Sequence, residues 1–362
     1  MADRTPIEWA DATWNPVVGC TRVSEGCRHC YAERLARRFS RPGQWGEGLT
    51  SGGARHFGWT GEVRLVEPAL AIPLRWRRPR RIFVCSTSDL FHERAADEAI
   101  DRVFAVMALC PQHTFLVLTK RPERMREYLE QIAGERDMQR WGNAAVDVTG
   151  SPCAAHIEDC DWPLPHVWLG ASVEDQATAN ARIPHLLQTP AARRFVSYEP
   201  ALGPVDFSRI PFIDGDCRHS RNVLTGKPLV YCEGIDGSPD FSARLDVDTG
   251  HLDWIIAGGE SGPGARPAHP DWFRQARDQA AAAGVPFFFK QWGDWRVIYD
   301  RDVDDPDLKR CDTILRETPK GRWLNLCGGH GFHGDRVVRA VRVGKKRAGR
   351  LLDGRTWDEV PA

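Results

Sequence analysis

The sequence has no excess of charge of either sign and no long hydrophobic run. Its 49 basic residues balance its 49 acidic residues, so no overall field attracts polyanions. No apolar stretch approaches the roughly 20 residues that span a bilayer, and the opening MADRTPIEW lacks the apolar segment of a signal peptide. We therefore expect a cytoplasmic protein without membrane contact, in which any contact with nucleic acid comes from local patches.

The sequence also lacks the pattern of a disulfide framework. It has 11 cysteines, an odd number, and cellular thiols keep cysteines of cytosolic proteins reduced. Clustered cysteines then predict metal binding or catalysis. The scattered Cys85, Cys110 and Cys311 are expected to be small buried hydrophobic residues.

Short apolar runs alternate with helical patterns along most of the chain. Apolar rather than alternating runs are typical of parallel strands buried on both faces, and their alternation with helices predicts a parallel sheet or barrel. We expect strands at residues 12–19, 81–86, 114–120, 166–172, 194–199, 252–260 and 285–291. We expect helices at residues 97–109, 121–133, 173–187 and 269–284.

The predicted fold is an α/β parallel (βα) barrel, complete or partial and TIM-like. It covers residues 1–295, with loop-rich insertions near 135–165 and 205–250. Residues 296–362 are predicted to form a C-terminal extension that packs on the barrel, because the alternation stops there.

Polar or permissive residues follow each of the later expected strands. In a parallel barrel such positions meet at one mouth, where active sites lie. The simpler explanation is that strands merely end in polar loops. The residues concerned include Ser86, Ser88, Asp89, Lys120, Ser172, Glu174, Glu199, Gly258, Gly259, Glu260 and Lys290.

Three cysteines, Cys20, Cys27 and Cys30, lie in a polar loop between the first expected strand and a helix that begins near Tyr31. A structural zinc ion takes four ligands, but the only further donor nearby is His29, which is adjacent to Cys30. Three thiolates that leave one position open suit a [4Fe–4S] cluster. Zinc with a distant fourth ligand, or no metal at all, are the alternatives.

Two resemblances accompany this loop. The segment CRHC (27–30) resembles the second half of the radical S-adenosylmethionine motif, although six residues rather than three separate the first two cysteines. Longer segments, including IEWADATWNPVVGC, RRIFVCSTSDLFHE and DWIIAGGESGPGARP, resemble a bacterial and bacteriophage family of three-cysteine proteins of unassigned function. That family is similar to radical S-adenosylmethionine enzymes in motif and fold.

The resemblance implies a set of roles for the polar residues. Cys20, Cys27 and Cys30 would bind the cluster, whose open iron would take the amino and carboxylate groups of S-adenosylmethionine. The Gly-Gly-Glu segment that usually follows the second strand occurs here after a later strand, at residues 258–260. The implied cofactor contacts are therefore Ser86, Ser88, Asp89, Ser172, Glu174 and His29, and the implied catalytic residues are Lys120, Glu199 and Glu260.

Two basic runs are candidate contacts for nucleic acid. One extends from Arg75 to Arg81 with five arginines, and the other covers residues 336–350 with seven lysines and arginines. Arginine clusters suit phosphate contacts. The alternatives are a solvated face for the first run and a strand packed on the domain for the second. No partner protein follows from the sequence.

Further cysteines and histidines lie in the two insertions and the tail. A zinc site that pairs the insertions would draw on Cys153, His156, Cys160, Cys217, His219 and Cys232. The simpler interpretation is loop residues without metal, and His330 and His333 are expected in a surface loop. Two functions of different class follow: a radical S-adenosylmethionine enzyme acting on a nucleic acid or nucleotide, or a zinc-stabilised nucleic-acid-binding protein without catalysis.

Overall fold

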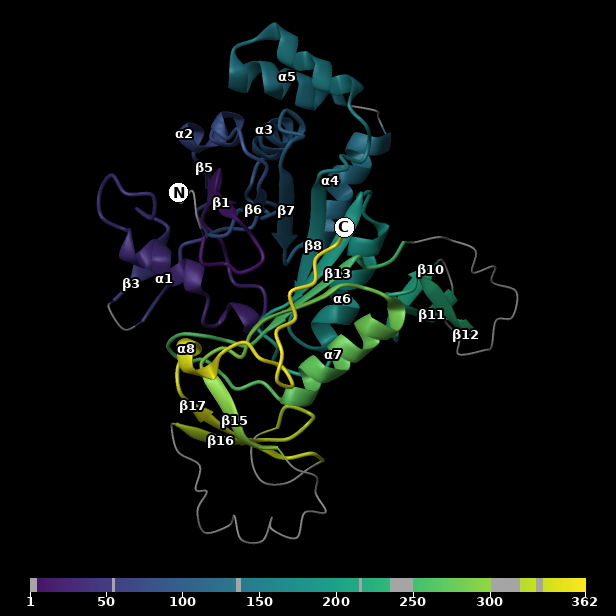
Figure 1. Ribbon diagram of the computed structural model, residues 1–362. Helices are drawn as coiled ribbons and strands as arrows, with labels where there is room; N and C mark the ends of the chain where they lie inside the picture. The colour runs from purple at the N-terminus through teal and green to yellow at the C-terminus, as the bar shows by residue number, and fades with distance from the viewer. Residues whose placement is uncertain are drawn as a thin grey trace, which may run out of the picture. The chain divides into compact units, whose positions relative to one another are not determined.

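The computed structural model describes residues 5–53, 56–134, 138–214, 217–234, 250–300, 320–329 and 335–362. The chain divides into two compact units (Figure 1). The first consists of Met1–Ser172 and His185–Phe195, and the second consists of Val173–Pro184 and Val196–Ala362.

The first unit contains most of the parallel strands and their helices. Its strands are β1 (Ala12–Trp14), β2 (Val17–Val18), β3 (Thr50–Gly52), β4 (Phe57–Trp59), β5 (Arg64–Leu65), β6 (Arg81–Val84), β7 (Thr114–Thr119) and β8 (Val167–Val173). Its helices are η1 (Glu25–Cys27), α1 (Tyr31–Arg38), α2 (Glu67–Leu70), η2 (Pro73–Arg75), α3 (Asp97–Ala108), α4 (Pro122–Gly134), α5 (Met138–Thr149) and η3 (Pro152–Asp159). The element β8 ends one residue inside the second unit.

The second unit is richer in antiparallel strands. Helix α6 (Gln176–Gln188) and strand β9 (Arg193–Tyr198) contribute to both units. The remaining strands are β10 (Ile210–Asp214), β11 (Cys217–Asn222), β12 (Lys227–Gly234), β13 (Trp254–Gly258), β14 (Phe287–Gln291), β15 (Trp295–Asp300), β16 (Gly321–Leu324) and β17 (Val338–Arg342). The helices are α7 (Pro270–Ala283) and α8 (Lys345–Ala348).

Seven strands form the main sheet in the order β1-β6-β7-β8-β9-β13-β14. The neighbours β1/β6, β6/β7, β7/β8 and β13/β14 pair in parallel. Every residue of β8 and of β13 is buried, as expected for strands covered on both faces. The prediction of a parallel α/β fold is confirmed in its partial-barrel form. Among the described residues β1 and β14 are the outer strands, and no closed barrel is shown.

The predicted regular elements are confirmed and the predicted loops are partly wrong. Each of the expected strands and helices listed above corresponds to an observed element. The first insertion, however, contains helix α5 rather than loops. Met138, Trp141 and Ala145 are buried along one face of it, and the indole of Trp141 stacks on Phe104 with ring centroids 4.8 Å apart. Apolar residues at this spacing stabilise a helix against a neighbouring one.

The second insertion was also predicted as loops and instead forms an antiparallel sheet, β10-β11-β12. Phe212 and His219 face each other across β10 and β11, with stacked rings whose centroids are 5.9 Å apart. Beyond β14, the strands β15-β17-β16 form another antiparallel sheet. The end of the chain runs beside β14, where the Phe289 amide donates to the Trp357 carbonyl over 2.9 Å.

Candidate functional site

The cysteine loop, residues 19–30, lies between β2 and α1 in the first unit. Gly19 forms a parallel bridge to Ser88, which follows β6, so the loop begins beside the carboxyl end of that strand. The φ angle of Gly19 is 93°, and a Cβ atom there would collide with the carbonyl oxygen of Glu62. Only glycine fits both conditions. Helix α1 begins at Tyr31, immediately after Cys30, as the sequence predicted.

The three cysteines lie near the beginning, in the second half and at the end of this loop. Cys27 is buried at the end of η1, and Cys20 and Cys30 are partly buried. The Cys27 amide donates to the carbonyl of Ser24 over 3.0 Å, and the Cys30 amide donates to the carbonyl of Cys27 over 3.3 Å. These local turns place Cys27 and Cys30 on consecutive parts of one short segment.

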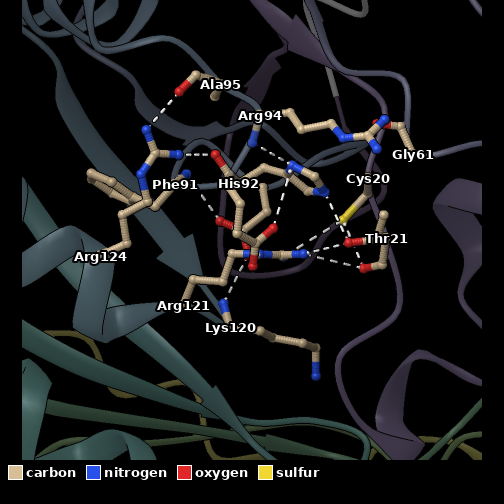
Figure 2. Close-up of polar contacts among 12 residues, drawn as sticks. Cys20, Thr21, Gly61, Phe91, His92, Arg94, Ala95, Lys120, Arg121 and Arg124 are labelled. Atoms are coloured by element: carbon tan, nitrogen blue, oxygen red, sulfur yellow. Dashed lines mark hydrogen bonds and ion pairs between the residues drawn. The ribbon is translucent and has the colours of Figure 1, made fainter.

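Arg121 is the centre of a polar network beside Cys20 (Figure 2). Its guanidinium donates from Nε to Glu93 over 2.7 Å and from Nη1 to Asp89 over 3.1 Å. Nη2 donates to the Thr21 hydroxyl over 2.7 Å, and Nη1 lies 3.9 Å from Cys20 Sγ. The side chain is 6% exposed. Arg121 therefore joins the loop after β6 to the cysteine loop.

Asp89 holds this arginine from inside the unit. One carboxylate oxygen accepts from Thr119 Oγ1 over 2.6 Å and from the Phe91 amide over 3.1 Å. The other accepts from the Lys120 amide over 3.0 Å and from Arg121. Burial opposes the charge of Arg121, but Asp89 and Glu93 raise the pKa of its guanidinium. A stable positive charge thus lies next to Cys20.

His92 also binds the Thr21 hydroxyl and completes the network. Its Nδ1 accepts from the amide of Arg94 over 3.1 Å, so Nε2 carries the hydrogen and donates to Thr21 Oγ1 over 2.9 Å. Burial first, and then the charge of Arg121, lower the pKa of His92. The Thr21 hydroxyl therefore accepts from a neutral imidazole and a charged guanidinium, which fixes its position.

The thiols of the loop are electrostatically coupled to one another. Burial, with Asp89 next in effect, raises the pKa of Cys20 to about 12, while Arg121 opposes the rise and Cys30 and Cys27 add to it. Burial also raises the pKa of Cys30, which Cys27 raises further and Lys120 lowers. The thiols of Cys20 and Cys30 are therefore protonated at neutral pH without metal, and binding of a metal to them would release protons.

The cysteine side chains of this loop are suitable ligands for an iron–sulfur cluster. In the structure, however, they are not grouped around a common centre as the ligands of a metal site are. Three sulfur donors without a carboxylate ligand suit iron–sulfur clusters and zinc. Across the part of the chain that the structure describes, no three His, Cys, Asp or Glu side chains form a group that could hold a metal ion. Metal binding would thus require the cysteine side chains to turn towards a common centre.

Two of the predicted cofactor contacts, Ser86 and Ser88, lie in the turn beside the start of this loop. Ser86 Oγ donates to the side-chain oxygen of Asn15 over 3.1 Å, and Ser88 Oγ donates to the carbonyl of Val17 over 2.7 Å. The Tyr31 hydroxyl donates to the carbonyl of Ser86. These bonds fix the Ser86–Ser88 turn against β1 and β2, and both hydroxyls keep capacity to accept a further hydrogen bond.

Other predicted residues of the first unit are placed as follows. In Figure 2 the Lys120 side chain extends away from the carboxylates that bind Arg121. His29 is partly buried in the turn before α1, and Ser172 is buried near the end of β8. Asp89 is so fully engaged that it acts on the site by holding Arg121, while its direct contact with a cofactor remains a prediction.

The predicted acidic residues of the second unit each have a basic partner. Glu174 accepts from Arg182 Nη1 over 3.1 Å, and both side chains are buried. Glu260 is held by Arg266, which donates from Nε over 2.9 Å and from Nη2 over 2.8 Å. The sequence gives no helical spacing that would have revealed the second pairing, because it lies in a loop rich in glycine and proline.

Glu199 lies at the carboxyl end of β9 and pairs with Lys290 of β14 over 3.1 Å. Ser197 Oγ also donates to it over 3.3 Å. The neighbouring β13 ends at Gly258, where an added Cβ would collide with Glu199 Oε1. Strands β9 and β14, which lie on either side of β13, therefore bring Ser197, Glu199 and Lys290 together. The predicted cavity of Lys120 with Glu199 and Glu260 joins residues of different units and stays a prediction.

The most important residue that sequence reasoning missed is Arg121. The apolar run TFLVLTK ends directly before it, so its place after a buried strand was visible. Its partners Asp89 and Glu93 lie about thirty residues away in sequence, which no local pattern reveals. Lys290 is predicted from the sequence to follow a strand, but its partner Glu199 lies 91 residues away. Arg182 and Arg266 were missed although they lie only eight and six residues from Glu174 and Glu260.

The two basic runs differ in exposure. In the first, Arg75, Arg77 and Arg78 are exposed before β6, and Arg80 stacks on the Trp76 ring at 4.8 Å. In the second, the alternative prediction of a packed strand is confirmed by β17 (Val338–Arg342). Lys345, Lys346 and Arg347 remain exposed in α8.

The further candidate ligands do not form a described site. His156 Nδ1 bonds to the carbonyl of Cys153 over 2.7 Å within η3, and Cys160 is partly buried after it. In the second unit, His219 Nε2 accepts from Arg221 Nε over 2.7 Å. The side chains of Cys217 and Cys232 and the residues His330 and His333 lie outside the described part of the chain.

Comparisons with known proteins give one family and one distant relative. The family described as "Protein of unknown function (DUF5131)" matches residues 4–361. A protein named alanine racemase from Verminephrobacter eiseniae (strain EF01-2) is 31% identical over 113 residues, which are 31% of this chain and 27% of that protein. The chain thus spans about a quarter of that relative's length. No solved structure matches. Within the described residues, none of the helices has the length and apolar character needed to cross a membrane.

Proposed function

Since the chain belongs to the family described as protein of unknown function (DUF5131), we propose its activity from the cysteine loop: it is an iron–sulfur enzyme of the radical S-adenosylmethionine type. Cys20, Cys27 and Cys30 would hold a [4Fe–4S] cluster, and the substrate would be a nucleic acid or a nucleotide. With S-adenosylmethionine, such a cluster supplies one-electron radical chemistry.

The observation that carries the proposal is the set of sulfur donors in one short loop. Cys30 and Cys27 both raise the pKa of Cys20, and Cys27 raises the pKa of Cys30, after the larger effect of burial in each case. The loop begins beside the carboxyl end of β6, the side of a parallel sheet where active sites lie. Three donors leave one coordination position for an exchangeable ligand, which a closed four-ligand zinc site does not.

The residues around the loop have distinct roles in this proposal. Arg121 places a buried positive charge beside Cys20, where it would offset the negative charge of thiolates. Asp89 and Glu93 hold that guanidinium in place. Ser86 and Ser88, fixed in the neighbouring turn, would bind polar groups of S-adenosylmethionine, and Lys120 would bind a carboxylate or phosphate of the cofactor or substrate.

The test is anaerobic reconstitution with iron and sulfide, followed by measurement of iron per chain and of the visible absorption spectrum. We expect a brown protein that loses its iron in Cys20→Ser, Cys27→Ser and Cys30→Ser variants while keeping its circular dichroism spectrum. Cys153→Ser is the matched control, because Cys153 is exposed outside the loop. Unchanged iron in all three loop variants would overturn the cluster.

Binding of S-adenosylmethionine is a separate part of the test. Calorimetry on the cluster-loaded and metal-free forms should detect binding only to the loaded form, because the open iron provides the ligand's main contact. Equal affinity for both forms would favour an ordinary cofactor site that does not involve the cysteines.

A zinc-stabilised nucleic-acid-binding protein is the second candidate. The exposed Arg75, Arg77 and Arg78 favour it, since exposed arginines suit phosphate contacts. A colourless protein that binds zinc in proportion to its chains, and whose nucleic-acid affinity falls in an Arg77→Glu/Arg78→Glu variant, would establish this function. A brown protein that cleaves S-adenosylmethionine would exclude it.

A further inference from the structure

Two consecutive residues of the cysteine loop, Thr21 and Arg22, are bound to different parts of the first unit. Thr21 is held by Arg121, whose guanidinium is fixed by Asp89 after β6 (Figure 2). Arg22 instead extends to Glu33 in helix α1, donating from Nε over 3.2 Å and from Nη2 over 2.5 Å. The chain just after Cys20 is thus tied both to the sheet and to α1.

Glu33 is a well-defined anchor for Arg22. Its side chain is only 4% exposed, whereas that of Arg22 is 45% exposed. The same carboxylate accepts from the Trp59 amide of β4 over 3.0 Å. A buried carboxylate that already accepts a backbone hydrogen bond has a fixed position, and two parallel bonds from a guanidinium fix the arginine as well.

The Arg22–Glu33 ion pair joins residues that lie close to the first and the last cysteine of the loop. Arg22 follows Cys20 by two residues, and Glu33 follows Cys30 by three. The pair therefore closes the segment 22–33, which contains Cys27 and Cys30, and Cys20 lies two residues before this segment. By contrast, the Arg28–Glu25 pair lies inside this segment, is exposed on both sides, and joins residues three apart.

We propose that Arg22 and Glu33 form a latch that holds Cys20 beside Cys27 and Cys30 before a metal binds. This inference rests on the proposed metal-binding function. Without this ion pair, α1 and the turn before it could move away from Cys20. The three thiols would then be brought together only as the metal binds. Ordering a site in advance lowers the entropic cost of binding. Arg22 and Glu33 are thus positioning residues and touch no metal.

The test uses cobalt(II) alone as the probe, titrated anaerobically into the metal-free full-length protein. The sulfur-to-cobalt charge-transfer band reports how many thiolates bind, and the midpoint gives the affinity. We expect Arg22→Ala and Glu33→Gln to weaken cobalt binding about 10- to 100-fold, the range typical of groups that orient metal ligands. Arg28→Ala is the matched control and should bind as the wild type does.

A second measurement follows the latch in the absence of any metal. Hydrogen exchange read by mass spectrometry should be faster at residues 19–24 in Arg22→Ala than in Arg28→Ala, because only the first variant opens the segment. Arg22→Lys should restore part of the affinity, since a lysine keeps the charge but cannot make two parallel bonds. Arg22 is largely exposed, so its variants test the latch even where Glu33→Gln does not fold.

The possible failures are distinguishable. If the wild-type protein gives no sulfur-to-cobalt band, the proposed metal function fails and the latch fails with it. If the band forms but Arg22→Ala and Arg28→Ala bind cobalt equally and exchange equally, the metal function stands and the latch is overturned.

Discussion

Arg121 Nη1 lies 3.1 Å from Asp89 Oδ2, and both side chains are almost completely buried, at 6% and 7% exposure. The pair joins the ends of β6 and β7 and supports the loop that contains Cys20. Because Asp89 also accepts from Thr119 and two backbone amides, it organises the carboxyl edge of this part of the sheet more than any other side chain described above.

Replacing Asp89 with asparagine should therefore be strongly destabilising. Of the acidic partners that the structure describes, the change leaves the buried charge of Arg121 with the exposed Glu93 alone. Breaking a buried pair in this way costs about 3–5 kcal/mol. Glu93→Gln is the matched control, expected to cost less than about 1 kcal/mol because that side chain is exposed. Urea unfolding of both variants measures the difference, and equal midpoints would refute the organising role.

The buried His113 should make the free energy of unfolding depend on pH. Burial lowers the pKa of His113, which is 1% exposed, so the unfolded chain takes up a proton at a higher pH than the folded one. The contribution of the neutral, buried imidazole to the free energy of unfolding is complete above the pKa of the unfolded chain, about 6.5. It is lost as the pH falls below that value. His113→Gln should flatten the fall in unfolding free energy between pH 7 and pH 5. Parallel wild-type and variant curves would contradict this.

Gly258 should not tolerate a side chain. A Cβ atom there would collide with Glu199 Oε1 and disturb the ion pair between Glu199 and Lys290. We expect Gly258→Ala to lower the free energy of unfolding by about 1–3 kcal/mol, as overpacking of an interior does. Gly53→Ala is the control, because nothing lies within 4 Å of its Cβ position. Thermal unfolding compares the stability of the two variants. If Gly258→Ala is as stable as Gly53→Ala, the side chain of Glu199 can move aside, which would contradict the prediction.

Helix α5 should contribute substantially to the first unit. The indole of Trp141 is fully buried, stacks on Phe104 and donates to the Tyr128 hydroxyl over 2.9 Å. Trp141→Ala should cost about 3–5 kcal/mol, whereas Asn143→Ala, at an exposed position of the same helix, should change stability by under about 0.5 kcal/mol. Chemical denaturation measures the stability of both variants. If they unfold at the same denaturant concentration, α5 does not stabilise the first unit.

The strands and helices of the parallel sheet were predictable because their signals are local. The runs RIFVCS and TFLVLTK are apolar over their whole length, and they form β6 and β7. The place of Cys20, Cys27 and Cys30 between the first strand and the first helix followed from the same patterns. Helix α5 was missed because its buried face is interrupted by polar and small residues, so that only packing against Phe104 shows which positions are interior.

The parallel α/β fold, the family and the three-cysteine loop could all be predicted from the amino-acid sequence, since each depends on residues that are close together in the chain. Which charged residues pair with one another depends on the folded structure. Arg121 forms ion pairs with Asp89 and Glu93. Arg22 pairs with Glu33 of helix α1, and Lys290 pairs with Glu199. Each of these pairs has at least one member that the fold largely buries, and a buried charge must be compensated. Burial, rather than spacing along the sequence, therefore decides where such pairs form.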